Sequence, residues 1–188
     1  MNKALLILDI QNDFISDEAR MPVAKHHIEP MLSSINSIII EADHLNIPVI
    51  YIGNEFEAKQ VISNWLRKNS AIKGSEGAKL DERLTIINDL YFPKNAANAL
   101  TNSELVSYLR EKNMKHLIIV GVFTEGCVTA TANGAIRENF SVTVVEDAVG
   151  SASDKKRVQS LQKLEGNGIT VMNSSELFRK LLNYEKVK

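Results

Sequence analysis

The sequence is poor in the residues that staple or subdivide small proteins. Its 188 residues include one cysteine, Cys127, with four prolines and nine glycines. A single cysteine excludes an internal disulfide framework. A chain of this length does not need one, because it buries roughly 70% of its unfolded surface on folding. No Pro/Gly-rich linker, repeat or low-complexity tract divides the chain, so we expect one domain over residues 1–188.

The chain also lacks an excess of one charge and a long apolar run. Its formal net charge is −1, which argues against a broad nucleic-acid footprint or an electrostatic membrane anchor. The longest apolar run, residues 117–123, is much shorter than the roughly 20 residues of a membrane-spanning helix. The apolar run at 4–8 is too short for a signal peptide. We therefore expect a cytoplasmic protein, with no nucleic-acid or membrane partner, whose thiol stays reduced.

Short apolar runs alternate with longer amphipathic segments. The runs are nearly continuous in apolar character, which is typical of strands covered on both faces. We predict strands at residues 4–9, 49–53, 85–90, 117–122, 142–146 and 169–172, and helices at 30–45, 103–113, 124–138, 153–167 and 174–182. Pro30 suits a first helical residue, and Val158, Leu161 and Leu164 form an apolar stripe. This alternation predicts an α/β protein with an open parallel sheet.

One segment, residues 54–83, does not fit the alternation. A connection this long in a compact domain is usually a functional lid or contains a further helix. Ile62, Trp65 and Leu66 are spaced for one or two helical turns. We predict one elaborated loop with a short helix.

Two chemically capable side chains follow predicted strands. In open α/β sheets ligands bind beyond the carboxyl ends of the strands. Asp9 ends the first strand, where a buried carboxylate must be paired or used in chemistry. Its alternative role is to cap the following turn. Lys94 lies just past the third predicted strand, and taken alone it is better explained as a solvated loop charge.

The single cysteine has the same kind of position. It lies in Gly121-Val-Phe-Thr-Glu-Gly-Cys127-Val128, directly after the most hydrophobic strand. Thr124 is a good N-cap, which would place Cys127 in a first helical turn, where the helix dipole lowers a thiol pKa. The free N–H groups of such a turn can also receive a developing oxyanion. The alternative is a buried, inert cysteine.

Motifs for metals and nucleotides are missing from the sequence. The four histidines, His26, His27, His44 and His116, have no ligand spacing, so we expect no metal site. No Walker loop is present, and the turn after the first strand has no glycine, so the dinucleotide fingerprint is also absent. We expect no cofactor.

Three motifs, taken in order, resemble the isochorismatase-like cysteine hydrolase superfamily. They are Asp9-x-Gln11-x-Asp13-Phe14, Phe92-Pro-Lys94 and the Gly121–Val128 segment. The resemblance implies a three-layer, six-stranded parallel sheet in the Rossmann-like order 3-2-1-4-5-6 with helices on both faces. It also implies a catalytic triad of Asp9, Lys94 and Cys127. A cis peptide at Val122–Phe123 would aim the N–H groups of Phe123 and Cys127 at an oxyanion.

The resemblance also implies a reaction. The Asp accepts the thiol proton, the Cys attacks the carbonyl of a small amide, and water resolves the thioester. Nicotinamidase members carry an Asp and two His for a metal after the second strand, whereas residues 51–58 contain no histidine, so nicotinamide is disfavoured. Two alternatives stay open. One is vinyl-ether hydrolysis of the isochorismatase type, although the enzymes that catalyse it generally lack the nucleophilic cysteine. The other is a non-catalytic binding protein with a redox-sensing thiol.

Aromatic residues near these motifs are the candidates for the substrate pocket. Phe14, Phe56, Trp65 and Phe123 could line its wall, although Trp65 is equally well explained by packing in the core or at a subunit interface. By analogy with the family we expect a homodimer or higher homo-oligomer, with residues 54–83 near the interface.

Overall fold

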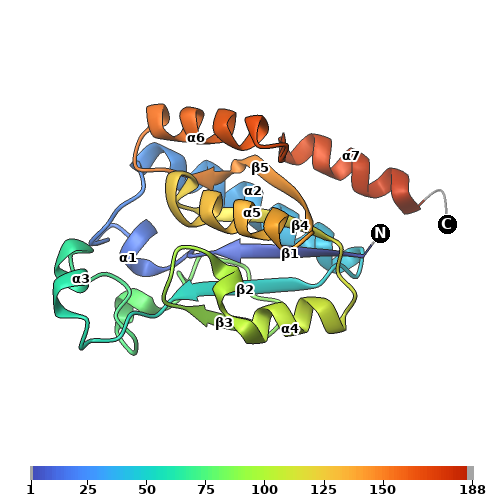
Figure 1. The fold of residues 1–188 in the computed structure, drawn as a ribbon. Helices are drawn as coiled ribbons and strands as arrows, with labels where there is room; N and C mark the ends of the chain where they lie inside the picture. Colours follow the sequence, from blue (N-terminus) through green and yellow to red (C-terminus); the bar gives the residue numbers. More distant parts are fainter. Residues whose placement is uncertain (1, 186–188) are drawn as a thin grey trace.

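The computed structural model describes residues 2–185 and contains one six-stranded sheet (Figure 1). The sheet order is β3-β2-β1-β4-β5-β6, and every neighbouring pair is parallel. The strands are β1 (Lys3–Leu8), β2 (Val49–Asn54), β3 (Tyr91–Lys94), β4 (His116–Val122), β5 (Ser141–Gly150) and β6 (Thr170–Met172). The predicted fold class and strand order are confirmed.

Helices cover both faces of this sheet. They are α1 (Asn12–Ile15), α2 (Lys25–His44), α3 (Val61–Leu66), α4 (Ser103–Glu111), α5 (Thr129–Arg137), α6 (Asp154–Gly166) and α7 (Ser174–Glu185). Alternate residues of a strand point to opposite faces. Leu5 and Ile7 of β1 therefore pack in one core with α2 and α7. Leu6 and Leu8 pack in the other with α4, α5 and α6. Within residues 2–185, no helix combines the length and apolar character needed to cross a bilayer.

The third strand begins later than the sequence indicates. Residues 85–90 are not a strand, because the Tyr51 side chain holds this segment away from the ladder. Its hydroxyl donates to the Thr85 carbonyl at 2.9 Å and accepts from the Ile87 N–H at 3.1 Å. The paired residues are Tyr91–Lys94. Pro93 is tolerated within them because β3 is an edge strand.

Two details of the predicted helices are also wrong. The second helix starts at Lys25, so Pro30 lies inside it and not at its first position. An exposed proline there removes one backbone hydrogen bond near the helix start. The early start places His26 and His27 in the first turn. On α6, Leu161 and Leu164 are buried as predicted, but Val158 is 48% exposed.

A close approach of β4 to β1 sets the spacing at the centre of the sheet. Gly121 has φ +114°, a conformation that side-chain-bearing residues rarely adopt. A Cβ at this position would lie 2.1 Å from the Leu8 carbonyl oxygen. Glycine at the end of β4 therefore lets the chain that leads to Cys127 pass directly beside the end of β1, where Asp9 follows.

Candidate active site

The three side chains of the predicted triad converge at the carboxyl edge of the sheet. The Lys94 ammonium, at the end of β3, lies 2.9 Å from Asp9 Oδ2 and 3.3 Å from Cys127 Sγ. The side chains of Lys94 and Asp9 are 0% and 1% exposed. Asp9 follows β1 directly, with φ 57°, a left-handed conformation that aspartate tolerates better than most residues. The lysine is therefore a buried cation between a carboxylate and a thiol.

Asn54 is a fourth member of this cluster that the sequence reasoning missed. Its Oδ1 accepts a hydrogen bond from Lys94 Nζ at 2.7 Å, and its Nδ2 lies 3.9 Å from Cys127 Sγ. Gln11 fixes it by pairing with its backbone: the Asn54 N–H donates to Gln11 Oε1 at 2.8 Å and its carbonyl accepts from Gln11 Nε2 at 2.9 Å. A signal was available, since Asn54 is a polar residue that ends a buried strand, like Asp9.

The turn that carries Cys127 differs from the predicted helix start. Residues Thr124–Val128 form one π-helical turn, η3, and α5 begins only at Thr129. The Phe123 carbonyl accepts from the Gly126 N–H at 2.9 Å and from the Val128 N–H at 3.2 Å. Thr124 is not the N-cap, because its hydroxyl donates to the Gly150 carbonyl at 2.8 Å. The Val122–Phe123 peptide bond is cis, at the position that the resemblance implied.

The candidate pocket aromatics separate into two groups. Phe14 contacts Phe123 edge to face, with ring centroids 5.6 Å apart, so this pair lies against the turn that carries Cys127. Phe56 is buried, with the Arg67 guanidinium 3.7 Å from its ring centroid. Trp65 lies on the outer surface of α3 and is 73% exposed. Trp65 therefore packs in neither described core, whereas Phe14 and Phe56 are buried and Phe123 is partly buried against the core.

The electrostatics of the cluster contradict the predicted activation of the thiol. Burial and the Asp9 carboxylate both raise the pKa of Cys127 and Lys94 offsets only part of this, so the net pKa is raised to about 12. Burial lowers the pKa of Lys94, but the charge of Asp9, together with that of Cys127 once its thiol ionises, more than compensates, so the net pKa is raised. At neutral pH the resting site therefore holds a protonated thiol beside a charged ammonium. The thiol needs a base.

Alkylation of the thiol should reveal this raised pKa. Because Cys127 is the only cysteine, iodoacetamide reports on one site. We expect the labelling rate to rise about tenfold per pH unit from pH 7 to pH 10, since only the thiolate reacts. Asp9→Asn should lower the pKa and accelerate labelling at pH 8, because it removes a negative charge beside the sulfur. The exposed Asp17→Asn is the matched control and should change nothing.

A rate that levels off near pH 8.5, where an ordinary thiol ionises, would contradict the raised pKa. Slower labelling of Asp9→Asn would contradict the idea that the Asp9 carboxylate raises the pKa of the Cys127 thiol. Both measurements use intact protein mass, so they require no substrate.

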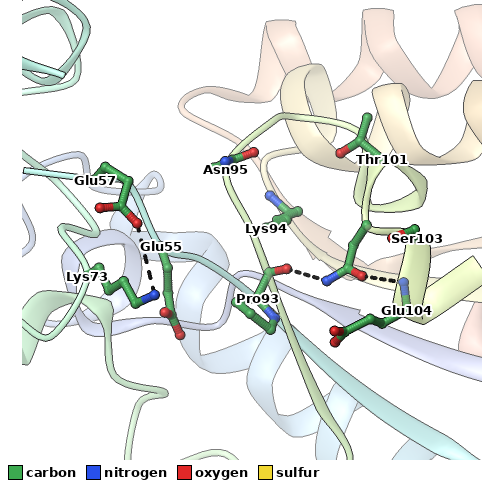
Figure 2. A pocket seen from close by; sticks show the side chains of 10 residues that line it. Glu55, Glu57, Lys73, Pro93, Lys94, Asn95, Thr101, Ser103 and Glu104 are labelled. Carbon is green, nitrogen blue, oxygen red and sulfur yellow. Dashed lines mark hydrogen bonds and ion pairs between the residues drawn. The ribbon is translucent and has the colours of Figure 1, made fainter. Parts of the chain in front are cut away.

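A cavity of about 380 Å³ lies beside the end of β3, and Pro93 and Lys94 are among the residues that line it. Figure 2 shows Glu57 and Lys73 on one side of it, Thr101, Ser103 and Glu104 on the other, and the strand with Pro93 and Lys94 between them. Its walls are mainly polar and charged. Lys94 lines it, whereas Asp9 and Cys127 do not.

Comparison with known proteins decides the family. Residues 3–176 match the model of the isochorismatase domain. The chain belongs to the isochorismatase family. The match spans most of the chain and confirms the resemblance drawn from the three motifs. The chain is therefore an isochorismatase-family hydrolase.

Individual relatives are distant in sequence but match over most of their length. A ureidoacrylate amidohydrolase of Yersinia enterocolitica is 29% identical over 174 residues, covering 79% of this chain and 75% of that protein. A probable inactive nicotinamidase of Arabidopsis thaliana is 26% identical, covering 89% of this chain and 90% of that protein. An isochorismatase-like hydrolase of Alkaliphilus metalliredigens superimposes with a TM-score of 0.88 at 20% identity, over 96% of this chain and 99% of that chain.

Proposed function

We propose that this isochorismatase-family hydrolase is a cysteine amidohydrolase that cleaves the C–N bond of a small amide through a thioester on Cys127. The observation that carries the proposal is the position of the Lys94 ammonium, 2.9 Å from the Asp9 carboxylate and 3.3 Å from the Cys127 sulfur. Burying an ion pair is costly. Because this buried ion pair lies against the only thiol of the chain, we infer that it serves the chemistry of that thiol.

The reaction follows from the protonation states of the site. Asp9 takes the thiol proton as Cys127 Sγ attacks the amide carbonyl, and Lys94 stabilises the thiolate as it forms. The backbone N–H groups of Phe123 and Cys127 are the proposed donors to the oxyanion. The C–N bond then breaks and Asp9 returns its proton to the departing amine. Water, deprotonated by Asp9, hydrolyses the thioester and restores the thiol.

The residues after β2 do not fit the metal site of nicotinamidase members. Asn54, the last residue of β2, has its amide engaged by Lys94 and directed at Cys127, and no histidine follows it in residues 55–58. No step of the proposed reaction passes through a metal. The similarity to a ureidoacrylate amidohydrolase supports a carbamoyl or carboxamide group as the substrate class.

An acyl adduct on Cys127 would test the proposal directly. The protein is mixed with a panel of small carboxamides and ureido compounds, quenched in acid within one turnover, and digested for mass spectrometry. We expect ammonia or amine release, and an acyl mass on the peptide that contains Cys127. Turnover without any adduct on this peptide would contradict a thioester. If no compound is hydrolysed while the thiol oxidises readily, a redox-sensing binding protein is the better account.

The proposal includes a cytoplasmic homo-oligomer. The support for the oligomer is α3, which exposes four apolar side chains on one short helix, an arrangement that favours contact with another subunit. They are Val61, Ile62, Trp65 and Leu66, each more than 70% exposed.

A further inference from the structure

A second cluster of titratable side chains joins two helix starts that are distant in the sequence. His26 and His27 lie in the first turn of α2, and Asp154 is the first residue of α6. The Nε2 atoms of His26 and His27 lie 2.9 Å and 2.6 Å from the same carboxylate oxygen, Asp154 Oδ1. Both helices begin at the carboxyl edge of the sheet, toward which the arrow of β1 points in Figure 1. None of the three residues belongs to the triad.

The three side chains present a metal-ligand set. Their ligand atoms all lie within 4.8 Å of one another, and the two imidazole centroids are 4.4 Å apart. Two imidazole nitrogens and one carboxylate oxygen are the donors that Zn²⁺ and other divalent first-row metals take.

The outer contacts of His27 suit a metal ligand. Its side chain is 10% exposed, and its Nδ1 lies 3.3 Å from the Ser151 carbonyl and 3.4 Å from the Ser151 N–H, so Nδ1 can donate to the carbonyl or accept from the N–H, depending on the tautomer. A histidine bound to a metal through Nε2 carries its proton on Nδ1, and a backbone carbonyl commonly accepts that proton and fixes the ring. Ser151 is itself fixed, since its carbonyl accepts from the Ala24 N–H at 2.9 Å and its hydroxyl donates to Glu125 at 2.6 Å.

We propose that His26, His27 and Asp154 form a surface site for a divalent transition metal, with Zn²⁺ as the first probe. His26 and Asp154 are 64% and 71% exposed, so water completes the coordination. Two helix N-termini meet at the site, and their dipoles oppose a cation, so affinity is modest, on the order of micromolar. The bound ion would join the starts of α2 and α6. His27 contacts Ser151, and Ser151 donates a hydrogen bond to Glu125 in the turn that carries Cys127, so the metal site would be connected to that turn.

Calorimetric titration of the full chain with ZnCl₂ tests the site. We expect one Zn²⁺ per chain, and binding weakened at least about tenfold in His26→Ala and in Asp154→Asn, each of which removes one ligand. Both positions are exposed, so these variants keep the fold, and their thermal unfolding without metal verifies this. His44→Ala is the matched control, because it removes an exposed histidine from the opposite end of α2, and its titration should equal that of the unaltered protein.

The thiol is the main competing ligand, so the titration is repeated in Cys127→Ala. Retained binding there, with loss in His26→Ala, supports the site. Binding that disappears with Cys127→Ala and persists in His26→Ala overturns it, as does the absence of any binding heat. Co²⁺ provides a second readout, since its visible spectrum reports nitrogen and oxygen ligands against a thiolate. None of these measurements uses hydrolytic activity, so the result is independent of the proposed reaction.

Discussion

Replacing Cys127 by alanine is expected to lower kcat/KM for any amide substrate by about a thousandfold or more, because the attacking atom is lost. Cys127→Ser should be nearly as inactive. A hydroxyl in the same place ionises less readily than a thiol, and burial and the Asp9 carboxylate oppose ionisation at this site. Initial rates of ammonia release at substrate concentrations well below KM measure kcat/KM for both variants. Their unfolding midpoints should stay close to that of the unaltered chain, which separates loss of chemistry from loss of structure.

Activity that survives in Cys127→Ala would contradict the nucleophile. If such a variant still hydrolyses a vinyl ether, and loses that activity when Asp9→Asn is added, the ether-cleaving alternative becomes the better description. Both reactions need Asp9, but only amide hydrolysis needs Cys127, so the same two variants distinguish them.

The second large effect concerns stability. Lys94→Met is expected to lower the free energy of unfolding by about 3–5 kcal/mol, because it leaves the Asp9 carboxylate buried without its cation. The side chains of Asp9 and Lys94 are 1% and 0% exposed, so solvent cannot replace the lost partner. Urea-induced unfolding at pH 7 measures the change. Lys73→Met is the matched control: its ion pair with Glu57 spans 4.0 Å with the lysine 61% exposed, and exposed pairs contribute at most about 1 kcal/mol.

A double variant tests the cause of that loss. Asp9→Asn combined with Lys94→Met removes both charges and should recover much of the stability lost in Lys94→Met, since a neutral pair carries no uncompensated buried charge. A double variant that is less stable than either single one would mean that packing and the bond to Asn54 outweigh the charge. Recovery of stability should not restore hydrolysis, because the base and the ammonium are both absent.

Much of the fold was accessible from local patterns. Continuous apolar runs such as 117–122 and amphipathic segments such as 174–182 are local patterns. They indicate strands and helices even when the elements that pack against them are unknown. The positions of Asp9 and Cys127 after buried strands placed both residues at one edge of the sheet, because parallel strands end at one edge, whereas their joining in a triad was predicted from the family resemblance. The third strand was misplaced for a reason that is not local: the hydroxyl of Tyr51, on a neighbouring strand, holds residues 85–90 out of the ladder.

The sequence by itself determined the sheet, its edge and the kinds of side chain that gather there. Only the tertiary structure decided the state of those side chains. A helix start predicts a lowered thiol pKa, but burial and the neighbouring Asp9 raise it to about 12. Spacing gave no ligand set for His26 and His27, yet the fold brings Asp154 against both. Desolvation and through-space contacts depend on the whole packed chain, so residue order does not encode them locally.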